Sequence, residues 1–361
     1  MIRLAMLAAL AATAAAGADK QLTLYFTGDN GGELSPCGCK HNPAGGLARR
    51  KTVLDNARAK GPVLLVDAGN ALFRAPGLQD EPSRARAEFL LGAMGRLDTF
   101  AMAAGARDLN AGAEFLRAAA QKAKVKVLSA NLRGKDGQAL FPASAIADVG
   151  GVKVGVIGVS PSGSLPGVSH LTGAPAGSAV LEEAKKLSGK VDLVLVLAAL
   201  PYNDAYQLAN EAESAVDVVL VSHDARPAGP AQRNAHNYVI PGGERGRQVG
   251  KLVLTLGGKG NFVDVQEMER EKQLLPLLAE RLALLEKRVA ATQDAEAKKL
   301  LVKELDQMKA SRKAHEKVIA QGSGKNARTI RLDWVNLGPD IKGDPELEKE
   351  VAKFEPAAAG H

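Results

Sequence analysis

The chain has 361 residues, a formal charge of +7 and only 4% aromatic residues. This length accommodates one large α/β domain with an appendage, or two smaller domains. The basic residues are dispersed and few aromatic rings accompany them, so the composition argues against nucleic-acid binding.

The N-terminus predicts a secretory signal peptide over residues 1–18. Arg3 precedes an alanine-rich apolar run at residues 4–16, which is too short to cross ~30 Å of hydrocarbon as a helix. Small residues at Ala14, Ala16 and Ala18 offer cleavage sites, and no later segment has eighteen uninterrupted apolar residues. We therefore expect a secreted, periplasmic protein that does not span the membrane.

Between residues 19 and 260, apolar β-branched runs alternate with segments of helical periodicity. The expected strands cover residues 22–27, 63–66, 125–128, 152–159, 193–197, 216–221, 238–240 and 251–256. The expected helices cover residues 47–60, 82–94, 111–124, 179–187 and 205–214. This alternation favours an α/β domain with helices on the faces of a sheet.

Residues 266–321 have the composition of long helices, rich in Glu, Lys, Arg, Leu and Ala. The apolar positions Leu278, Leu282, Leu285 and Val289 step by four, three and four. An antiparallel hairpin fits this pattern best, and one continuous coiled coil is the alternative. Its apolar seam either packs on the protein itself or binds a partner or a second copy.

Residues 326–361 are predicted to form a C-terminal extension. A strand is expected at residues 329–337 and a charged helix around residues 346–353, before a tail at residues 356–361.

Short motifs follow the expected strands in a fixed order. They are Thr27-Gly28-Asp29-Asn30-Gly31-Gly32, Val66-Asp67-Ala68-Gly69-Asn70, Gly105-Ala106-Arg107-Asp108, Ser129-Ala130-Asn131, the 151–158 strand and the 216–223 strand ending in Ser222-His223. Together they resemble the calcineurin-like metallophosphoesterase domain of 5′-nucleotidases and periplasmic UDP-sugar hydrolases, the UshA-like family, over residues 20–256. The resemblance implies a four-layer α/β/β/α sandwich that holds two metal ions at strand ends.

The metal ligands that the resemblance implies are mostly missing. Asp29, Asn70 and His223 remain, and Asn70 replaces a bridging aspartate, so it brings no charge between two cations. The other replacements are Gly31, Ala106, Arg107 and Ala225. We therefore expect no classical two-metal phosphoesterase activity. The alternative is a hydrolase whose reduced site holds one divalent ion (Zn, Mn or Fe).

The loop after the first strand carries both cysteines of the chain, Cys37 and Cys39, separated by Gly38. It resembles a Cys-Gly-Cys subset of UshA-like proteins, some of which are described as selenoproteins. A disulfide across one glycine closes a small strained ring, and strain makes a disulfide oxidising and labile. Cys37 and Cys39 are therefore candidate catalytic residues.

Three further interpretations concern the same loop. The basic residues Lys40, His41, Arg49 and Arg50 are expected to lower a cysteine pKa if they lie nearby. Cys37, Cys39 and His41 also suit Cu(I) or Zn(II), whereas the cysteine spacing excludes haem, which requires Cys-x-x-Cys-His. A disulfide that only stiffens the loop is the third possibility.

Arg49, which follows the glycine pair Gly45-Gly46 at a helix start, and Arg107 are candidate anion-binding residues. Three functions stay open at this point. They are thiol or soft-metal chemistry with an unknown periplasmic partner, a reduced metal-dependent hydrolase, and a non-enzymatic scaffold that binds a partner through its helical segment.

Overall fold

The structure is a computed structural model that describes residues 20–37, 43–77, 79–165, 167–168, 170–224, 226–258, 260–324 and 326–354. The expected signal peptide, together with Cys39, His41 and Ala225, lies outside these residues. No helix among the described residues is both long enough and apolar enough to cross a membrane.

Two sheets form the centre of the globular part. The first has seven strands in the order β17-β18-β16-β1-β4-β5-β6, and the second has six in the order β14-β15-β13-β12-β9-β8. The strands of the first sheet are β1 (Lys20–Thr27), β4 (Val63–Asp67), β5 (Thr99–Ala103), β6 (Lys126–Leu128), β16 (Gln248–Leu256), β17 (Val263–Asp264) and β18 (Arg328–Asn336). Those of the second are β8 (Ser144–Val149), β9 (Val152–Val159), β12 (Leu193–Ala198), β13 (Val218–Val221), β14 (Gln232–Arg233) and β15 (Tyr238–Pro241).

Helices and short strands complete the fold. The helices are α1 (Leu47–Arg58), α2 (Glu81–Arg96), α3 (Ala113–Ala123), α4 (Ala176–Leu187), α5 (Tyr202–Ala212), α6 (Val265–Ala291), α7 (Ala295–Ser323) and α8 (Pro345–Val351), with a 3-10 turn η1 (Glu213–Ala215). The remaining strands are β2 (Pro36–Cys37), β3 (Ala44–Gly45), β7 (Leu132–Arg133), β10 (Gly163–Ser164) and β11 (Thr172–Gly173).

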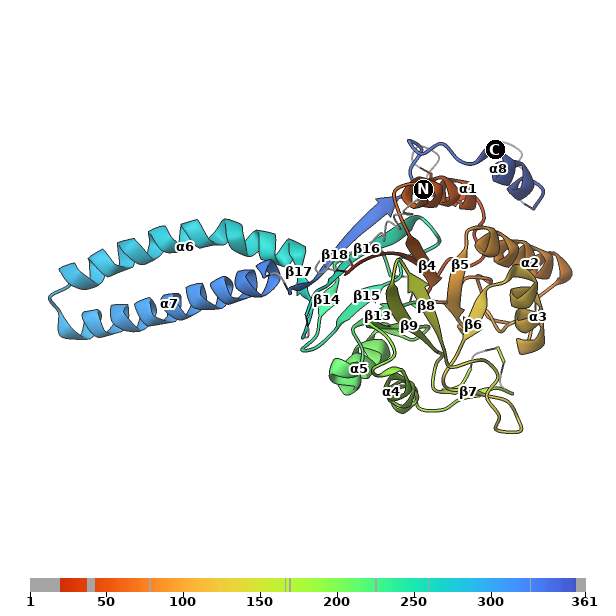
Figure 1. Ribbon diagram of the computed structural model, residues 1–361, viewed down its shortest axis with the longest axis horizontal. Helices are drawn as coiled ribbons and strands as arrows, with labels where there is room; N and C mark the ends of the chain where they lie inside the picture. Colours follow the sequence, from red (N-terminus) through yellow and green to blue (C-terminus); the bar gives the residue numbers. More distant parts are fainter. Residues whose placement is uncertain are drawn as a thin grey trace, which may run out of the picture.

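The alternation of side chains along each strand separates the layers. On β1, Leu24 and Phe26 face the second sheet, whereas Tyr25 packs on the other side with Leu54 of α1. On β9, Val156 faces the first sheet, whereas Ile157 packs in the cluster that holds α4 and α5. The result is the expected α/β/β/α sandwich, with α1–α3 outside one sheet and α4 and α5 outside the other (Figure 1).

Two strands of five or more residues escaped the sequence analysis, as did the two-residue strands. β5 reads Thr-Phe-Ala-Met-Ala and lacks β-branched residues apart from its first, yet it pairs with β4 and β6 inside the sheet. β8 is an edge strand with exposed residues that hide its pattern, and it pairs antiparallel with β9. Both strands owe their state to neighbours in the sheet rather than to local propensity.

The helical segment forms a hairpin that projects from the globular part (Figure 1). α6 and α7 are separated by residues 292–294 and share a seam of Leu282, Leu285 and Leu305. The chain then returns to the sheet, because β18 pairs along its whole length with β16 and in parallel with β17. The hairpin is thus inserted between two strands of one sheet.

Candidate functional site

The ends of β1, β4, β5 and β13 bring the motif residues to one place. Asp29 follows β1, Asn70 follows β4, Arg107 follows β5 and His223 follows β13. The first three strands belong to the seven-stranded sheet and β13 to the six-stranded sheet, so the carboxyl ends of strands in the two packed sheets meet at this place.

Asp29 is fixed by its backbone. It has a left-handed conformation (φ 52°), and its N–H donates to Gly69 O at 3.0 Å and to Ser222 Oγ at 2.9 Å. Gly28 allows this approach, since a Cβ there would lie 3.0 Å from the Ser222 Cβ. The Asp29 side chain is only 1% exposed.

Arg107 forms an ion pair with the Asp29 carboxylate. Its Nη1 also donates to Arg74 O at 3.4 Å, so the guanidinium contacts both residues. Burial lowers the pKa of this guanidinium, although the neighbouring Asp108 raises it. The charge of the buried Asp29 is therefore balanced by a side chain of the protein itself.

Both polar atoms of the Asn70 side chain form hydrogen bonds within the protein. Its Nδ2 donates to Ser222 O at 3.0 Å, and its Oδ1 accepts the Arg107 N–H at 3.1 Å. The residue also has a left-handed backbone (φ 54°) and is 1% exposed. Its amide therefore joins three loops of the structure together.

Asp108 holds the loop after β4. Its carboxylate accepts the N–H groups of Asn70 at 2.7 Å, Leu72 at 2.9 Å and Gly105 at 3.0 Å, and it is fully buried. Burial raises the pKa of Asp108 to about 7, and Asp67 adds to the rise, while the three backbone donors lower it. The sequence analysis included Asp108 in a motif but assigned it no role. The only sequence feature that pointed to it was an acidic residue directly after Arg107.

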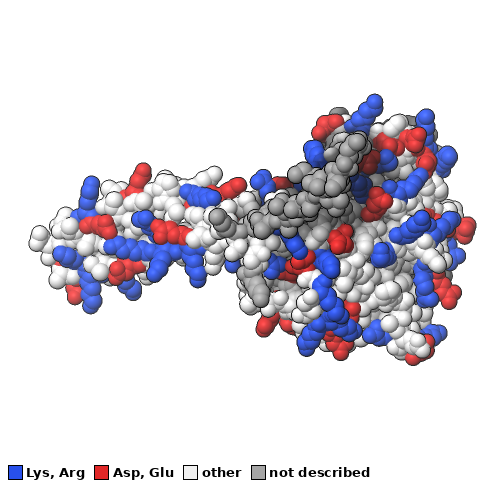
Figure 2. All heavy atoms as spheres, in the orientation of Figure 1, with Lys and Arg blue, Asp and Glu red and all other residues white. Residues whose placement is uncertain are grey.

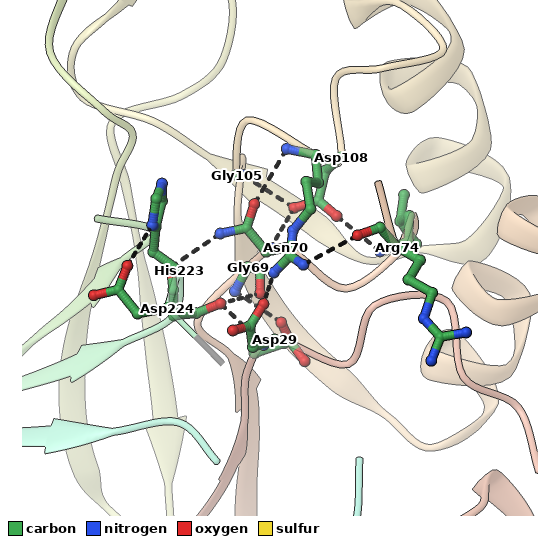
Figure 3. A network of polar contacts seen from close by, with 12 residues as sticks. Asp29, Gly69, Asn70, Arg74, Gly105, Asp108, His223 and Asp224 are labelled. Atoms are coloured by element: carbon green, nitrogen blue, oxygen red, sulfur yellow. Dashed lines mark hydrogen bonds and ion pairs between the residues drawn. The ribbon is translucent and has the colours of Figure 1, made fainter. Parts of the chain in front are cut away.

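His223 faces Asp224 rather than Asp29. Its Nδ1 hydrogen bonds with Asp224 Oδ1 at 2.7 Å, and Asp224 Oδ2 accepts the N–H of Tyr202 at 2.9 Å (Figure 3). Burial raises the pKa of Asp224, but these hydrogen bonds and the nearby Arg226 outweigh burial, so that pKa lies below its usual range.

The hollow that Asp29 and His223 line measures about 10 Å³, roughly the room of one water. Two metal ions about 3.5–4 Å apart do not fit there. Among the residues that the structure describes, no three His, Cys, Asp or Glu side chains are grouped for a metal ion. With Asp29 paired to Arg107 and the Asn70 amide occupied, the described residues do not fit a dinuclear centre.

The cysteine loop starts beside this pocket. β2 and β3 pair through Cys37 and Ala44, and the Cys37 Sγ lies 3.9 Å from Arg245 O. The N–H of the same Arg245 donates to Asp29 O at 2.9 Å. One residue therefore connects Cys37 to Asp29, whereas Cys39 and His41 fall outside the described residues.

Three arginines and one glutamate surround Cys37. Glu33 Oε1 accepts from Arg245 Nη2 at 2.6 Å and lies 3.5 Å from Arg74 Nη2. Burial raises the pKa of the Cys37 thiol; Arg245, Arg247 and Arg74 lower it and Glu33 raises it, with a net rise. The sequence analysis assigned no role to Arg245 or Arg247.

The expected lowering of the cysteine pKa by Arg49 and Arg50 is therefore wrong for Cys37. Arg50 is buried and donates to Asn30 Oδ1 at 2.6 Å. Arg49 Nη1 donates to the carbonyl oxygens of Pro43 at 2.8 Å and Leu337 at 3.0 Å. Both guanidiniums hold the loop to the rest of the protein.

The Cys37 environment makes its reactivity testable in a Cys39→Ser background. We expect iodoacetamide to react with Cys37 at a higher pH midpoint in the folded protein than in the urea-unfolded chain, because burial disfavours the thiolate. Glu33→Gln should lower the midpoint and Arg245→Ala should raise it. A folded midpoint below the unfolded one would contradict this account.

Comparisons with known proteins agree with the fold. No protein-family model and no curated protein sequence matches the chain. Among solved structures, a 5′-nucleotidase precursor from Thermus thermophilus superposes with a TM-score of 0.63 at 21% identity, covering 93% of this chain and 58% of that one. The sulfate thiohydrolase SoxB of the same organism gives 0.56 at 17% identity, covering 65% and 54%.

The calcineurin-like phosphoesterase YfkN from Bacillus subtilis gives a TM-score of 0.54 at 18% identity, covering 66% of this chain and 85% of that one. The chain thus has a metallophosphoesterase-like fold of the kind found in 5′-nucleotidases and calcineurin-like phosphoesterases. It spans little more than half the length of the first two proteins.

Proposed function

We propose that this protein is exported to the periplasm and uses a phosphoesterase-like fold for thiol–disulfide chemistry instead of two-metal hydrolysis. The observation that carries the proposal is the ion pair of Arg107 with Asp29. A guanidinium on this carboxylate competes with any metal ion for the same charge, and it cannot activate water as a bound metal does. The hydrolytic chemistry of the fold is thereby disfavoured.

Cys37 supports the second half of the proposal. It lies next to the same pocket, and its reduced form is a protonated thiol at neutral pH because burial raises its pKa. Such a thiol is a slow nucleophile. We therefore assign the active role to the oxidised form, a Cys37–Cys39 disulfide that accepts electrons.

In the proposed reaction, a partner that carries two thiols reduces the Cys37–Cys39 disulfide. A thiolate of the partner attacks one sulfur of the Cys37–Cys39 disulfide and forms a mixed disulfide, while the other cysteine leaves as a thiolate and takes up a proton. The second thiol of the partner then attacks the partner's own sulfur in the mixed disulfide, and the bound cysteine is released as a thiol. Two electrons and two protons pass to Cys37 and Cys39, and the partner leaves as a disulfide.

The test starts with the mature protein, purified from an exporting host without chelator. We expect no stoichiometric metal, no free thiol before reduction, and two after it. Against a glutathione buffer, the disulfide should have a reduction potential above about −230 mV, since structural disulfides lie below about −300 mV. Exchange should be lost in Cys37→Ser, reduced less in Asp29→Asn and retained in Ser35→Ala, which changes the same loop.

Two results would overturn the proposal. Two equivalents of zinc, manganese or iron, with phosphate-ester hydrolysis that Asp29→Asn abolishes, would establish the hydrolase alternative. One equivalent of copper or zinc that blocks both thiols until it is removed would instead support a soft-metal site of Cys37, Cys39 and His41.

A further inference from the structure

The helical hairpin carries most of the large apolar side chains that are exposed in the described part of the chain. Six large apolar side chains are exposed in the described part of the chain, and five lie on α6 or α7: Leu274, Leu277, Leu284, Leu300 and Val302. Leu277, Leu284 and Leu300 are exposed by 62%, 63% and 69%. The hairpin also stands clear of the globular part (Figure 2), so no described element of this protein covers these side chains.

Four of these residues lie on one flank of the hairpin. The seam between the helices includes Leu282, Leu285 and Val289 on α6 and Leu301, Leu305 and Met308 on α7, spaced as in a heptad. Residues one position after a seam residue share a flank in an antiparallel pair, and Glu286 and Lys309 meet on that flank at 3.0 Å. Leu284 and Leu300 each come one position before a seam residue and therefore share the opposite flank. Leu277 and Leu274 lie on the same flank, because they come seven residues, or two turns, before Leu284 and before Arg281, the residue that precedes Leu282.

We call this opposite side the leucine flank; it consists of Leu274, Leu277, Arg281, Leu284, Arg288, Leu300, Glu304 and Gln307. Its positive charges lie on α6 and its one negative charge on α7. Arg281 and Glu304 lie at the same level of the hairpin, because their neighbours Leu282 and Leu305 pack in one cluster. The charges of the flank are therefore complementary to those of a second copy when α6 of one copy faces α7 of the other.

We propose that two copies of this protein dimerise through the leucine flank and form a four-helix bundle. A two-fold axis parallel to the hairpin sets Arg281 of each copy against Glu304 of the other, and Leu284 beside Leu300 of the other. The two globular parts then lie at the same end of the bundle.

The available area suits a stable dimer. α6 has 27 residues, which gives a length of about 40 Å, and two helices side by side are about 20 Å wide. Over its full length, this side of the hairpin offers about 800 Å² per copy, the size of a standard protein–protein interface, and the leucine flank takes up about half of that length. The seam between α6 and α7 buries three leucines, which is a small apolar core for helices of this length. A second hairpin would add its own seam and enlarge the core to that of a four-helix bundle.

The experiment measures the mass of the full mature chain by size-exclusion chromatography with light scattering, at several concentrations. We expect twice the chain mass and a melting temperature that rises with concentration. Leu277→Glu with Leu284→Glu should raise the dimer Kd at least about 100-fold, since both side chains lie at the centre of the flank. Val302→Glu, the matched control on the opposite flank, should leave the Kd unchanged.

Charge reversal tests the axis. Arg281→Glu or Glu304→Arg alone should weaken the dimer, and the two together should restore it, with unchanged circular dichroism in every variant. A monomeric wild-type protein would overturn the proposal, as would Val302→Glu weakening the dimer as much as the leucine variants. A double charge reversal that fails to recover would also contradict it.

Discussion

Replacing Arg107 with alanine is expected to lower the free energy of unfolding by about 3–5 kcal/mol, the loss typical of breaking a buried ion pair. The Asp29 carboxylate is 1% exposed, and the change removes the guanidinium that pairs with it beside a pocket that admits about one water. Urea denaturation followed by circular dichroism measures the effect.

Two further variants identify the cause. Arg74→Ala removes an arginine of the same region whose side chain is 69% exposed and whose ion pair is long, so the loss should stay below about 1 kcal/mol. Arg107→Ala combined with Asp29→Asn should regain most of the lost stability, because the buried charge is gone. Equal losses for Arg74→Ala and Arg107→Ala would show that the buried ion pair contributes no more to stability than the exposed one.

Asp108→Ala is expected to cost about 2–6 kcal/mol, because it removes the acceptor of the buried N–H groups of Asn70 and Leu72 and each loss costs about 1–3 kcal/mol. The same change frees Asn70, so we expect the pocket to become accessible to small reagents. Urea denaturation gives the energy. If the alanine variant does not fold, Asp108→Asn, which keeps one acceptor oxygen, should fold with a smaller loss.

The control for this prediction is Asp306→Ala, an acid on the exposed face of α7, which should change stability by less than about 0.5 kcal/mol. If Asp108→Ala lowers the free energy of unfolding no more than this, water must replace the carboxylate as the acceptor. The hydrogen bonds of Asp108 would then not be needed for stability.

Local patterns explain why the sandwich could be predicted. Runs such as Val152–Val159 are apolar at nearly every position because both faces of their sheet are covered, and this signal survives without any tertiary information. The position of Asp29, Asn70 and His223 at the carboxyl ends of strands was also predictable, because each follows a recognisable strand.

The contacts within the site were not predictable in the same way. Arg107 reaches Asp29 across 78 residues of sequence, and Arg245 reaches Glu33 across 212. Such pairs leave no periodic pattern, since they depend on which loops the topology brings together. The same reason concealed the role of β18, whose pairing with β16 depends on the chain returning after the hairpin.

That return has a consequence for how the protein tolerates change. Val263 of β17 pairs with Thr329 of β18, so the chain departs from the sheet and rejoins it at neighbouring positions. Everything between these residues can be shortened, lengthened or exchanged without altering the path of any other strand. The hairpin is therefore a separable insertion. Replacing it with a short polar linker should leave the globular part folded, including its cysteine loop, so that this part can be studied by itself.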